Sequence, residues 1–268
     1  MPTLLRSPQN FLSENLRVLD PIRAHRYFAD FGEEEDFQVR RFWQVYASRK
    51  DLIDFGSRRT KIRYSFNNES KKYYRQVRGL RKQVVPLHSI KLDITRFAAN
   101  ICKVQRELAQ PLVTGQITVQ EWYGGTTRLM KYSYRAAIDI ARGSSNPMSL
   151  EEEREFLRVI EEENSKFGMY AKQVANGSVP LDGRILNAAC SLGKRINSIF
   201  ENWKLWDARR SGCTQARRRL TAAEHCRSTE RRHGCVELAR KGWQSIWAIT
   251  PIGGAACWHG CLCEMEYR

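Results

Sequence analysis

Six of the eight cysteines lie in roughly the last fifth of the chain. Together with three of the five histidines, they are the residues best suited to bind a metal ion. A structural zinc site takes four thiolate or imidazole ligands, commonly one pair from each of two short turns. Two turns offer such ligands: His225, Cys226, His233 and Cys235 in the first, and Cys257, His259, Cys261 and Cys263 in the second. These residue types therefore point to a structural metal centre.

The same residues also allow a metal-free interpretation. Eight residues separate Cys226 from Cys235, where a gap of about two to four is typical of a zinc pair. The alternative is a small lobe with reduced thiols, packed by Trp243, Trp247 and Trp258. A disulfide framework is less favoured, because the mixture of charged and apolar residues in the first thirty positions does not indicate a signal peptide or an oxidising compartment.

Catalytic motifs are missing from the sequence. It contains no H-E-x-x-H pair, zinc-deaminase pattern, Walker A loop, Rossmann fingerprint or Gly-x-Ser-x-Gly elbow. A zinc hydrolase would need an open coordination position and a nearby base, for which Glu224 and Glu237 are the available carboxylates. We therefore expect a protein that is not an enzyme, and a metal-dependent hydrolase is the weakest alternative.

Positive charge is the second feature of the composition. The 268 residues include 45 Lys and Arg against 29 Asp and Glu, a net charge of +16, which favours an anionic partner. Much of the excess lies in two tracts, 58–82 and 209–219, and aromatic residues interleave the first. Such tracts suit nonspecific phosphate contacts, although they could equally form solvated faces or pair with acidic protein surfaces. The candidate nucleic-acid-binding residues are Arg58, Arg59, Lys71, Lys72, Arg75, Arg78, Arg81, Arg217, Arg218 and Arg219.

Helical periodicity dominates the middle of the chain. Apolar residues alternate at spacings of four and three before Pro111 and Gly115, which we expect to end the first of these helices. Ser/Thr-x-x-Glu capping boxes at Thr118 and Ser149 begin two more. The expected helices span about 90–110, 119–142, 150–176 and 185–206. Short connections between them favour antiparallel packing in a helical bundle.

The sequence thus predicts a mainly α fold with four parts: an N-terminal arm at 1–32, a helical bundle body at 33–206, a basic linker at 207–219 and a small, irregular Cys/His-rich lobe at 220–268. An aromatic helix is expected within 33–56, and the tract 57–82 receives no assignment. No apolar run approaches the roughly 18 residues needed to cross a bilayer, so a soluble intracellular protein with no membrane partner is the simplest expectation.

Several short segments follow one another in a recognisable order. The last fifty residues contain AEHC, CVELARKGW, a Pro-x-Gly turn at Pro251, then Cys257, Cys261-x-Cys263 and MEYR. Upstream lie YYRQVRGLRKQVVP and LVTGQITVQEW. This order, over about 73–268, resembles the minor head proteins of tailed bacteriophages in the head-morphogenesis group.

The resemblance implies a structural component of the virion. Such a minor head (capsid) protein takes part in head assembly through contacts with the portal or major capsid protein. It resides in the phage head, and in the host cytoplasm during assembly. Contact with packaged double-stranded DNA would be nonspecific. The alternative is a zinc-dependent intracellular nucleic-acid-binding protein unrelated to a capsid.

The resemblance also implies a ligand set for the metal. Its cysteine pattern matches Cys226, Cys235, Cys257, Cys261 and Cys263. With His225, these give six candidates, four of which would hold one structural zinc ion.

Overall fold

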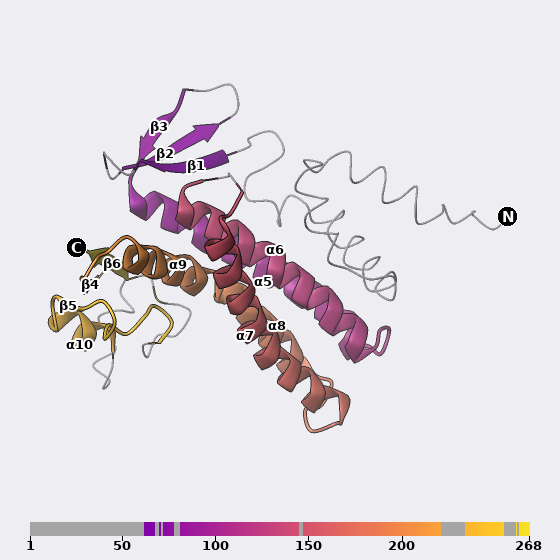
Figure 1. The fold of residues 1–268 in the computed structure, drawn as a ribbon. Coiled ribbons are helices and arrows are strands. Elements are labelled where there is room, and N and C mark those ends of the chain that lie inside the picture. The colour runs from indigo at the N-terminus through magenta and orange to yellow at the C-terminus, as the bar shows by residue number, and fades with distance from the viewer. Residues whose placement is uncertain are drawn as a thin grey trace.

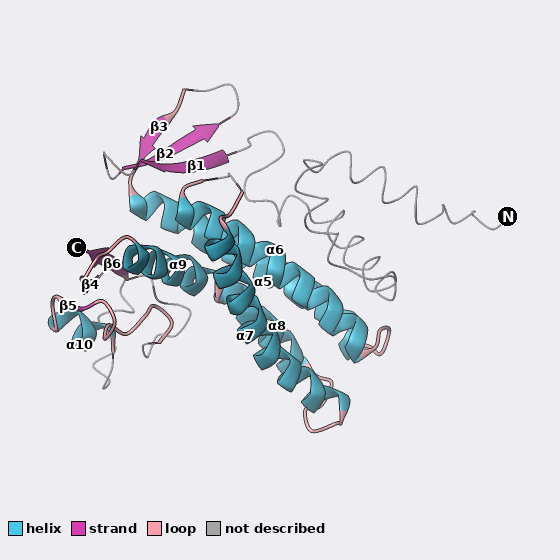
Figure 2. Ribbon diagram, in the orientation of Figure 1, coloured by secondary structure: helices cyan, strands magenta, loops and turns pink. Residues whose placement is uncertain are grey.

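The computed structural model describes residues 62–67, 70, 72–77, 81–144, 147–220, 234–254, 261 and 263–268, and the expected arm at 1–32 and aromatic helix within 33–56 lie outside them. Long helices form the body, one small sheet caps it and a second lies in the C-terminal lobe (Figure 1, Figure 2). The elements are β1 (Ile62–Asn67), β2 (Lys72–Val77), β3 (Gln83–Val85), α5 (Leu87–Val113), α6 (Val119–Arg142), α7 (Leu150–Ala175), α8 (Gly183–Lys194), α9 (Ile196–Arg210), β4 (Gln215–Arg219), α10 (Cys235–Arg240), β5 (Gln244–Ser245) and β6 (Glu264–Tyr267).

The mainly α expectation is confirmed. Helix α5 buries the predicted apolar stripe, including Ile90, Ile101 and Leu108, in the core of the body. Pro111 does not end this helix, because a proline in the last turn forfeits only one intrahelical hydrogen bond and α5 continues to Val113. Across the part of the chain that is described, no helix is both long and apolar enough to cross a membrane.

Both predicted capping boxes are present. The Thr118 hydroxyl accepts a hydrogen bond from the Glu121 amide at 3.2 Å, and the Glu121 carboxylate accepts one from the Thr118 amide at 2.6 Å. At the start of α7, the Ser149 hydroxyl accepts the amide of Glu152 in the same way. These local bonds satisfy amides that a helix N-terminus leaves without partners, and they fix where α6 and α7 begin.

Helices α5 and α8 pack very closely. A Cβ placed on Gly193 would lie 2.7 Å from the Cys102 backbone nitrogen and 3.1 Å from the Ala98 carbonyl oxygen, so glycine is required at this crossing. One turn before Gly193, Cys190 forms a disulfide with Cys102, with the two Cα atoms 4.3 Å apart. The single helix expected at 185–206 is instead two helices, α8 and α9, which meet at Arg195.

Strands β1 and β2, in the tract that had no assignment, and β3, directly after it, form an antiparallel sheet. Its inner face carries Tyr64, which donates its hydroxyl hydrogen to Asp93 of α5, and Tyr73, whose hydroxyl lies 3.4 Å from the Ala141 carbonyl oxygen of α6. The Phe66 amide donates to the carbonyl of Gly143, which ends α6 with a φ of 60°. The sheet is thereby joined to the body at both α5 and α6.

The prediction of a basic linker at 207–219 is wrong. Helix α9 runs on to Arg210, and Gln215–Arg219 is strand β4, the central strand of the order β5-β4-β6. The lobe therefore begins earlier than expected, and Leu205 of α9 already contributes to its core. The other buried members of that core are Ala216, Cys235, Leu238, Ile246, Ile249, Ile252, Cys261, Cys263 and Met265.

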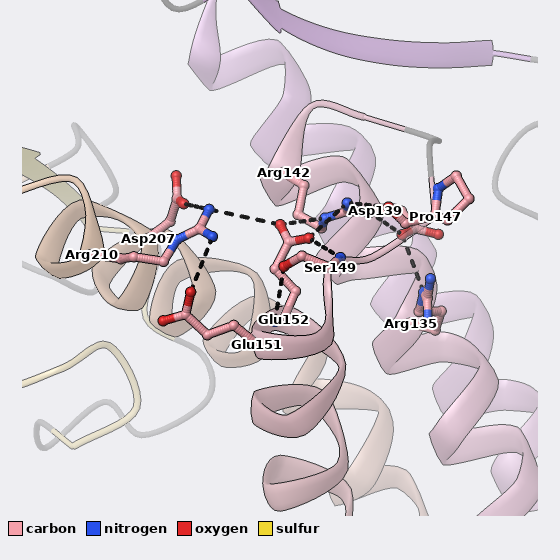
Figure 3. A network of polar contacts seen from close by, with 9 residues as sticks. All are labelled: Arg135, Asp139, Arg142, Pro147, Ser149, Glu151, Glu152, Asp207 and Arg210. Carbon is pink, nitrogen blue, oxygen red and sulfur yellow. Dashed lines mark hydrogen bonds and ion pairs between the residues drawn. The ribbon is translucent and has the colours of Figure 1, made fainter.

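A polar network joins three helix ends (Figure 3). Arg142, at the end of α6, contacts the Glu152 carboxylate with Nε at 2.9 Å and Nη2 at 3.1 Å. Arg210, at the end of α9, lies 3.6 Å from Glu151 and 3.9 Å from Glu152. Because Glu152 also caps α7, one carboxylate connects the ends of α6 and α9 to the start of α7.

Replacing Gly193 by alanine should destabilise the protein by roughly 1–3 kcal/mol, because the added methyl group overpacks the contact between α5 and α8. The matched control is Gly168→Ala in α7, where the nearest atom to a new Cβ is the Tyr123 hydroxyl at 3.5 Å. That change should stabilise the helix by up to about 1 kcal/mol. Urea denaturation followed by circular dichroism measures both, and equal effects of the two substitutions would contradict the close crossing.

Stability should fall in acid partly through Glu152. Burial favours a higher pKa of this carboxyl, but hydrogen bonds from Arg142 and the Ser149 amide outweigh it, so its pKa is lowered. The carboxylate thus stabilises the fold above its unfolded-state pKa of about 4.3, and this stabilisation is lost as the pH falls through the lower folded-state pKa.

The test compares Glu152→Gln with Glu151→Gln, whose side chain is 64% exposed. Glutamine at 152 still accepts the capping hydrogen bond, so this variant should be less stable at about pH 7 and lose less stability than wild type from about pH 5 to pH 3. Glu151→Gln should follow wild type. Urea midpoints over this range measure the difference, and parallel acid limbs for wild type and Glu152→Gln would refute it.

Candidate metal centre

Three cysteines converge inside the C-terminal lobe. Cys235 is the first residue of α10, and Cys261 and Cys263 lie just before strand β6. All three are at least 98% buried, and their sulfur atoms lie within 4.8 Å of one another. Residues separated by up to 28 positions are thus brought to one point by the pairing of β4 with β6 and by the packing of α10 on β4.

The geometry of these sulfur atoms fits a tetrahedral thiolate site. Zinc–sulfur bonds of about 2.3 Å place two sulfur ligands about 3.8 Å apart. The Sγ atoms of Cys235 and Cys261 are 3.6 Å apart. Soft thiolate donors favour Zn²⁺ and similar metals over the hard cations that prefer oxygen. The three cysteines can therefore supply three of the four ligands of a zinc ion.

A guanidinium group lies beside the three sulfur atoms. Arg218 of β4 is only 3% exposed, and its Nη1 lies 3.3 Å from Cys261 Sγ and 3.7 Å from Cys235 Sγ. Burial alone would lower the pKa of this guanidinium, but the three cysteines outweigh burial and raise it. The site is therefore electrostatically suited to negatively charged sulfur.

An ion pair attaches the site to the helical body. Lys91 of α5 donates from Nζ to the Cys263 carbonyl oxygen at 2.8 Å and lies 2.7 Å from the Glu201 carboxylate of α9. The two side chains are 12% and 4% exposed. A buried charge is costly without a partner, so Lys91 stays paired with Glu201. The hydrogen bond from Lys91 then holds the Cys263 peptide against α5 and α9.

The structure brings together half of the predicted ligand set. Cys235, Cys261 and Cys263 form the cluster, whereas His225, Cys226 and Cys257 lie outside the described residues. Cys213 is half-buried at the edge of the lobe core and is not part of the cluster.

The tryptophan packing of the metal-free alternative is wrong for Trp247. That side chain is 72% exposed, and the buried lobe core among the described residues consists of aliphatic, methionine and cysteine side chains. Trp243 is half-buried, with the Arg217 and Arg268 guanidinium groups 4.8 Å and 4.3 Å from the centre of its ring. Trp258 lies outside the described residues.

Strand geometry corrects one predicted nucleic-acid contact, that of Arg218, and places Arg75 on the inner face of its sheet. Successive side chains of a strand point to opposite faces, so in β4 Arg217 and Arg219 are exposed while Arg218 is buried among the cysteines. Arg75 of β2 pairs across the sheet with the buried Tyr64, is half-buried and has a buried Nε. Arg218 is therefore not placed to contact a phosphate backbone, whereas the half-buried Arg75 keeps part of its side chain accessible.

The remaining basic candidates have mixed surroundings. Arg217 and Arg219 both form ion pairs with Glu266 of β6, which offsets part of their charge. Lys72 and Arg81 are exposed. The candidates that lie outside the described residues are Arg58, Arg59, Lys71 and Arg78.

Sequence reasoning missed two features that the fold creates. The disulfide between Cys102 and Cys190 depends on a helix crossing, for which Gly193 was an available but weak signal. The inward position of Arg218 was hidden because three consecutive arginines show no alternation of polar and apolar residues. Recognising 215–219 as a strand would have predicted that the middle arginine points away from the other two.

Protein-family models, curated protein sequences and solved structures contain no match to this chain. The residues and the geometry of the lobe therefore carry the functional interpretation.

Purified wild-type protein should contain about one zinc ion per chain, and Cys261→Ser should lose it. Because the ligands lie in the lobe core, loss of zinc should unfold the lobe and leave the helical body folded. Cys213→Ser is the matched control and should retain the metal. Elemental analysis measures zinc, and limited proteolysis shows which part unfolds. Metal-free wild-type protein with unchanged thermal stability would refute the zinc site.

Proposed function

We propose that this chain is a minor head protein of a tailed bacteriophage, a virion component that acts by assembly and whose C-terminal lobe binds one structural zinc ion. The observation that carries the proposal is the convergence of Cys235, Cys261 and Cys263. These are three of the five positions that match the cysteine pattern of the family it resembles. Their convergence supports a metal-binding role for that pattern, because cysteines far apart in the sequence form a single buried site.

The surroundings of the sulfur atoms support a structural role for the metal. A catalytic zinc ion keeps one coordination position open to water or substrate, whereas structural sites are closed by protein ligands. Cys235, Cys261 and Cys263 are buried, and Arg218 covers two of them with donor groups. Binding of a structural metal ion is coupled to folding, so zinc would add to the stability that the buried apolar residues described in the lobe provide.

The surface of the lobe favours protein partners. Trp247 is 72% exposed with the Arg209 guanidinium 4.9 Å from its ring centre, and the Trp243 ring lies against Arg217 and Arg268. Tryptophan and arginine are the residues most enriched at energetically important positions of protein interfaces. In the proposed head protein, this surface contacts the portal or the major capsid protein.

Contact with packaged DNA is the smaller part of the proposal. Lys72 and Arg81 are exposed and suit nonspecific phosphate contacts, but Arg217 and Arg219 already pair with Glu266. A free nucleic-acid-binding protein would need basic side chains directed toward a ligand. The inward positions of Arg75 and Arg218 therefore weigh against that alternative.

The protein should be present in virions purified from a lysate of the strain that encodes it. Quantitative mass spectrometry of nuclease-treated, gradient-purified particles should find it at a constant copy number relative to the portal and major capsid proteins. Host cytoplasmic proteins of similar abundance in the lysate serve as the control and should be depleted. Particles that contain portal and major capsid proteins but lack this chain would refute the proposal.

A further inference from the structure

The middle arginine of strand β4 is a feature that the proposed assembly role does not use. The strand presents Arg217 and Arg219 to its outer face and Arg218 to the interior, where the side chain is 97% buried. Burying an arginine is costly unless its charge is compensated and its donors are satisfied. The groups that contact Arg218 therefore indicate the role of this buried positive charge in the lobe.

Arg218 is held from one side and directed toward sulfur on the other. Its Nη2 donates to the carbonyl oxygens of Thr250 at 2.9 Å and Pro251 at 3.2 Å. Its Nη1 donates to the sulfur atoms of Cys261 and Cys235. Because the guanidinium is planar and rigid, bonds to the two carbonyls fix the direction in which Nη1 points. Lysine, with a single ammonium group, cannot reproduce both sets of contacts.

The charge of this group matches the charge of a thiolate metal centre. Three thiolates around one divalent cation carry one excess negative charge, and the Arg218 guanidinium carries one positive charge. Groups that hydrogen-bond to metal ligands orient them and tune the site, and their loss typically costs about 10- to 100-fold in metal affinity. The surface arginines of the same strand have no such contact with the cluster among the described residues.

We infer that Arg218 is a positioning residue of the metal site, which orients Cys235 and Cys261 and supplies the counter-charge for an anionic zinc–thiolate centre. This inference rests on the proposed zinc site. The three arginines at 217–219 therefore have different roles. The central one contacts the metal site inside the lobe, and its two neighbours lie on the surface. The positive charge of Arg218 is balanced by a metal centre with several thiolate ligands, whereas a centre with only neutral ligands would leave that buried charge unbalanced.

The test compares Arg218→Met with Arg217→Met and Arg219→Met, which remove the same side chain from the outer face of the same strand. Each full-length protein is loaded with one equivalent of zinc, and transfer of zinc to a chromophoric chelator is followed. Arg218→Met should release zinc about 10- to 100-fold faster than wild type, whereas the two controls should stay within about twofold. The thiolate-to-metal charge-transfer band of the cobalt-substituted proteins should shift only in the Arg218 variant.

A second experiment keeps the test decisive if the lobe of Arg218→Met does not fold without zinc. Excess zinc favours the metal-bound, folded lobe by mass action, so zinc titrations followed by near-ultraviolet circular dichroism give the concentration at which each lobe folds. Arg218→Met should need the most zinc and Arg218→Lys an intermediate amount, because lysine restores the charge without the paired hydrogen bonds. Equal zinc requirements for these two variants would show that charge does not matter and would overturn the inference.

The outcomes also separate this inference from the proposed site. A wild-type chain that takes up no zinc overturns both. A wild-type chain that binds zinc, together with an Arg218→Met variant that releases it at the wild-type rate, overturns the role of Arg218 alone.

Discussion

Helix α9 belongs to two hydrophobic cores at once, and the placement of the lobe depends on this. Trp203 is buried in the core of the body, and Leu205, two residues later, is buried in the core of the lobe. Glu201 of the same helix holds Lys91, whose ammonium group also binds the Cys263 carbonyl oxygen. Because one rigid helix carries these contacts, the lobe has a fixed position against the body, and Cys263 lies close to their junction.

Charged groups as well as apolar side chains lie in the interior of the lobe and at its border with the body. Among the described residues, ten buried side chains form the core of the lobe, and apolar contacts alone impose little directional order on them. The Arg218 guanidinium among three sulfur atoms, and the Lys91–Glu201 pair at the border with the body, impose directional contacts that aliphatic side chains cannot. The same groups would be strongly destabilising without their partners, so the lobe is stable only when its polar groups are correctly arranged.

Local signals made the helical body predictable, whereas the site depends on contacts between distant residues. The caps at Thr118 and Ser149 act within four residues, so the sequence alone predicted the starts of α6 and α7 correctly. The clustering of cysteines indicated a metal centre, and three of them do converge. The inward position of Arg218 was missed because 215–219 was not recognised as a strand, which forms only when β4 pairs with distant β6. The Cys102–Cys190 bond likewise requires the packing of α5 against α8.

The pairing of β4 with β6 has a consequence for the order in which the molecule forms. Arg217 and Glu266, which meet across these strands, are 49 residues apart in the chain, whereas each helix of the body grows from contacts within a few residues. Closing long loops is slow and costs entropy before any contact offsets it. We therefore expect the individual helices, α9 among them, to form before the sheet of the lobe closes. Packing of the body also joins distant residues, since Cys102 and Cys190 are 88 positions apart. Closure of the lobe is then the step that brings Cys235, Cys261 and Cys263 together, so the proposed metal site cannot exist before it.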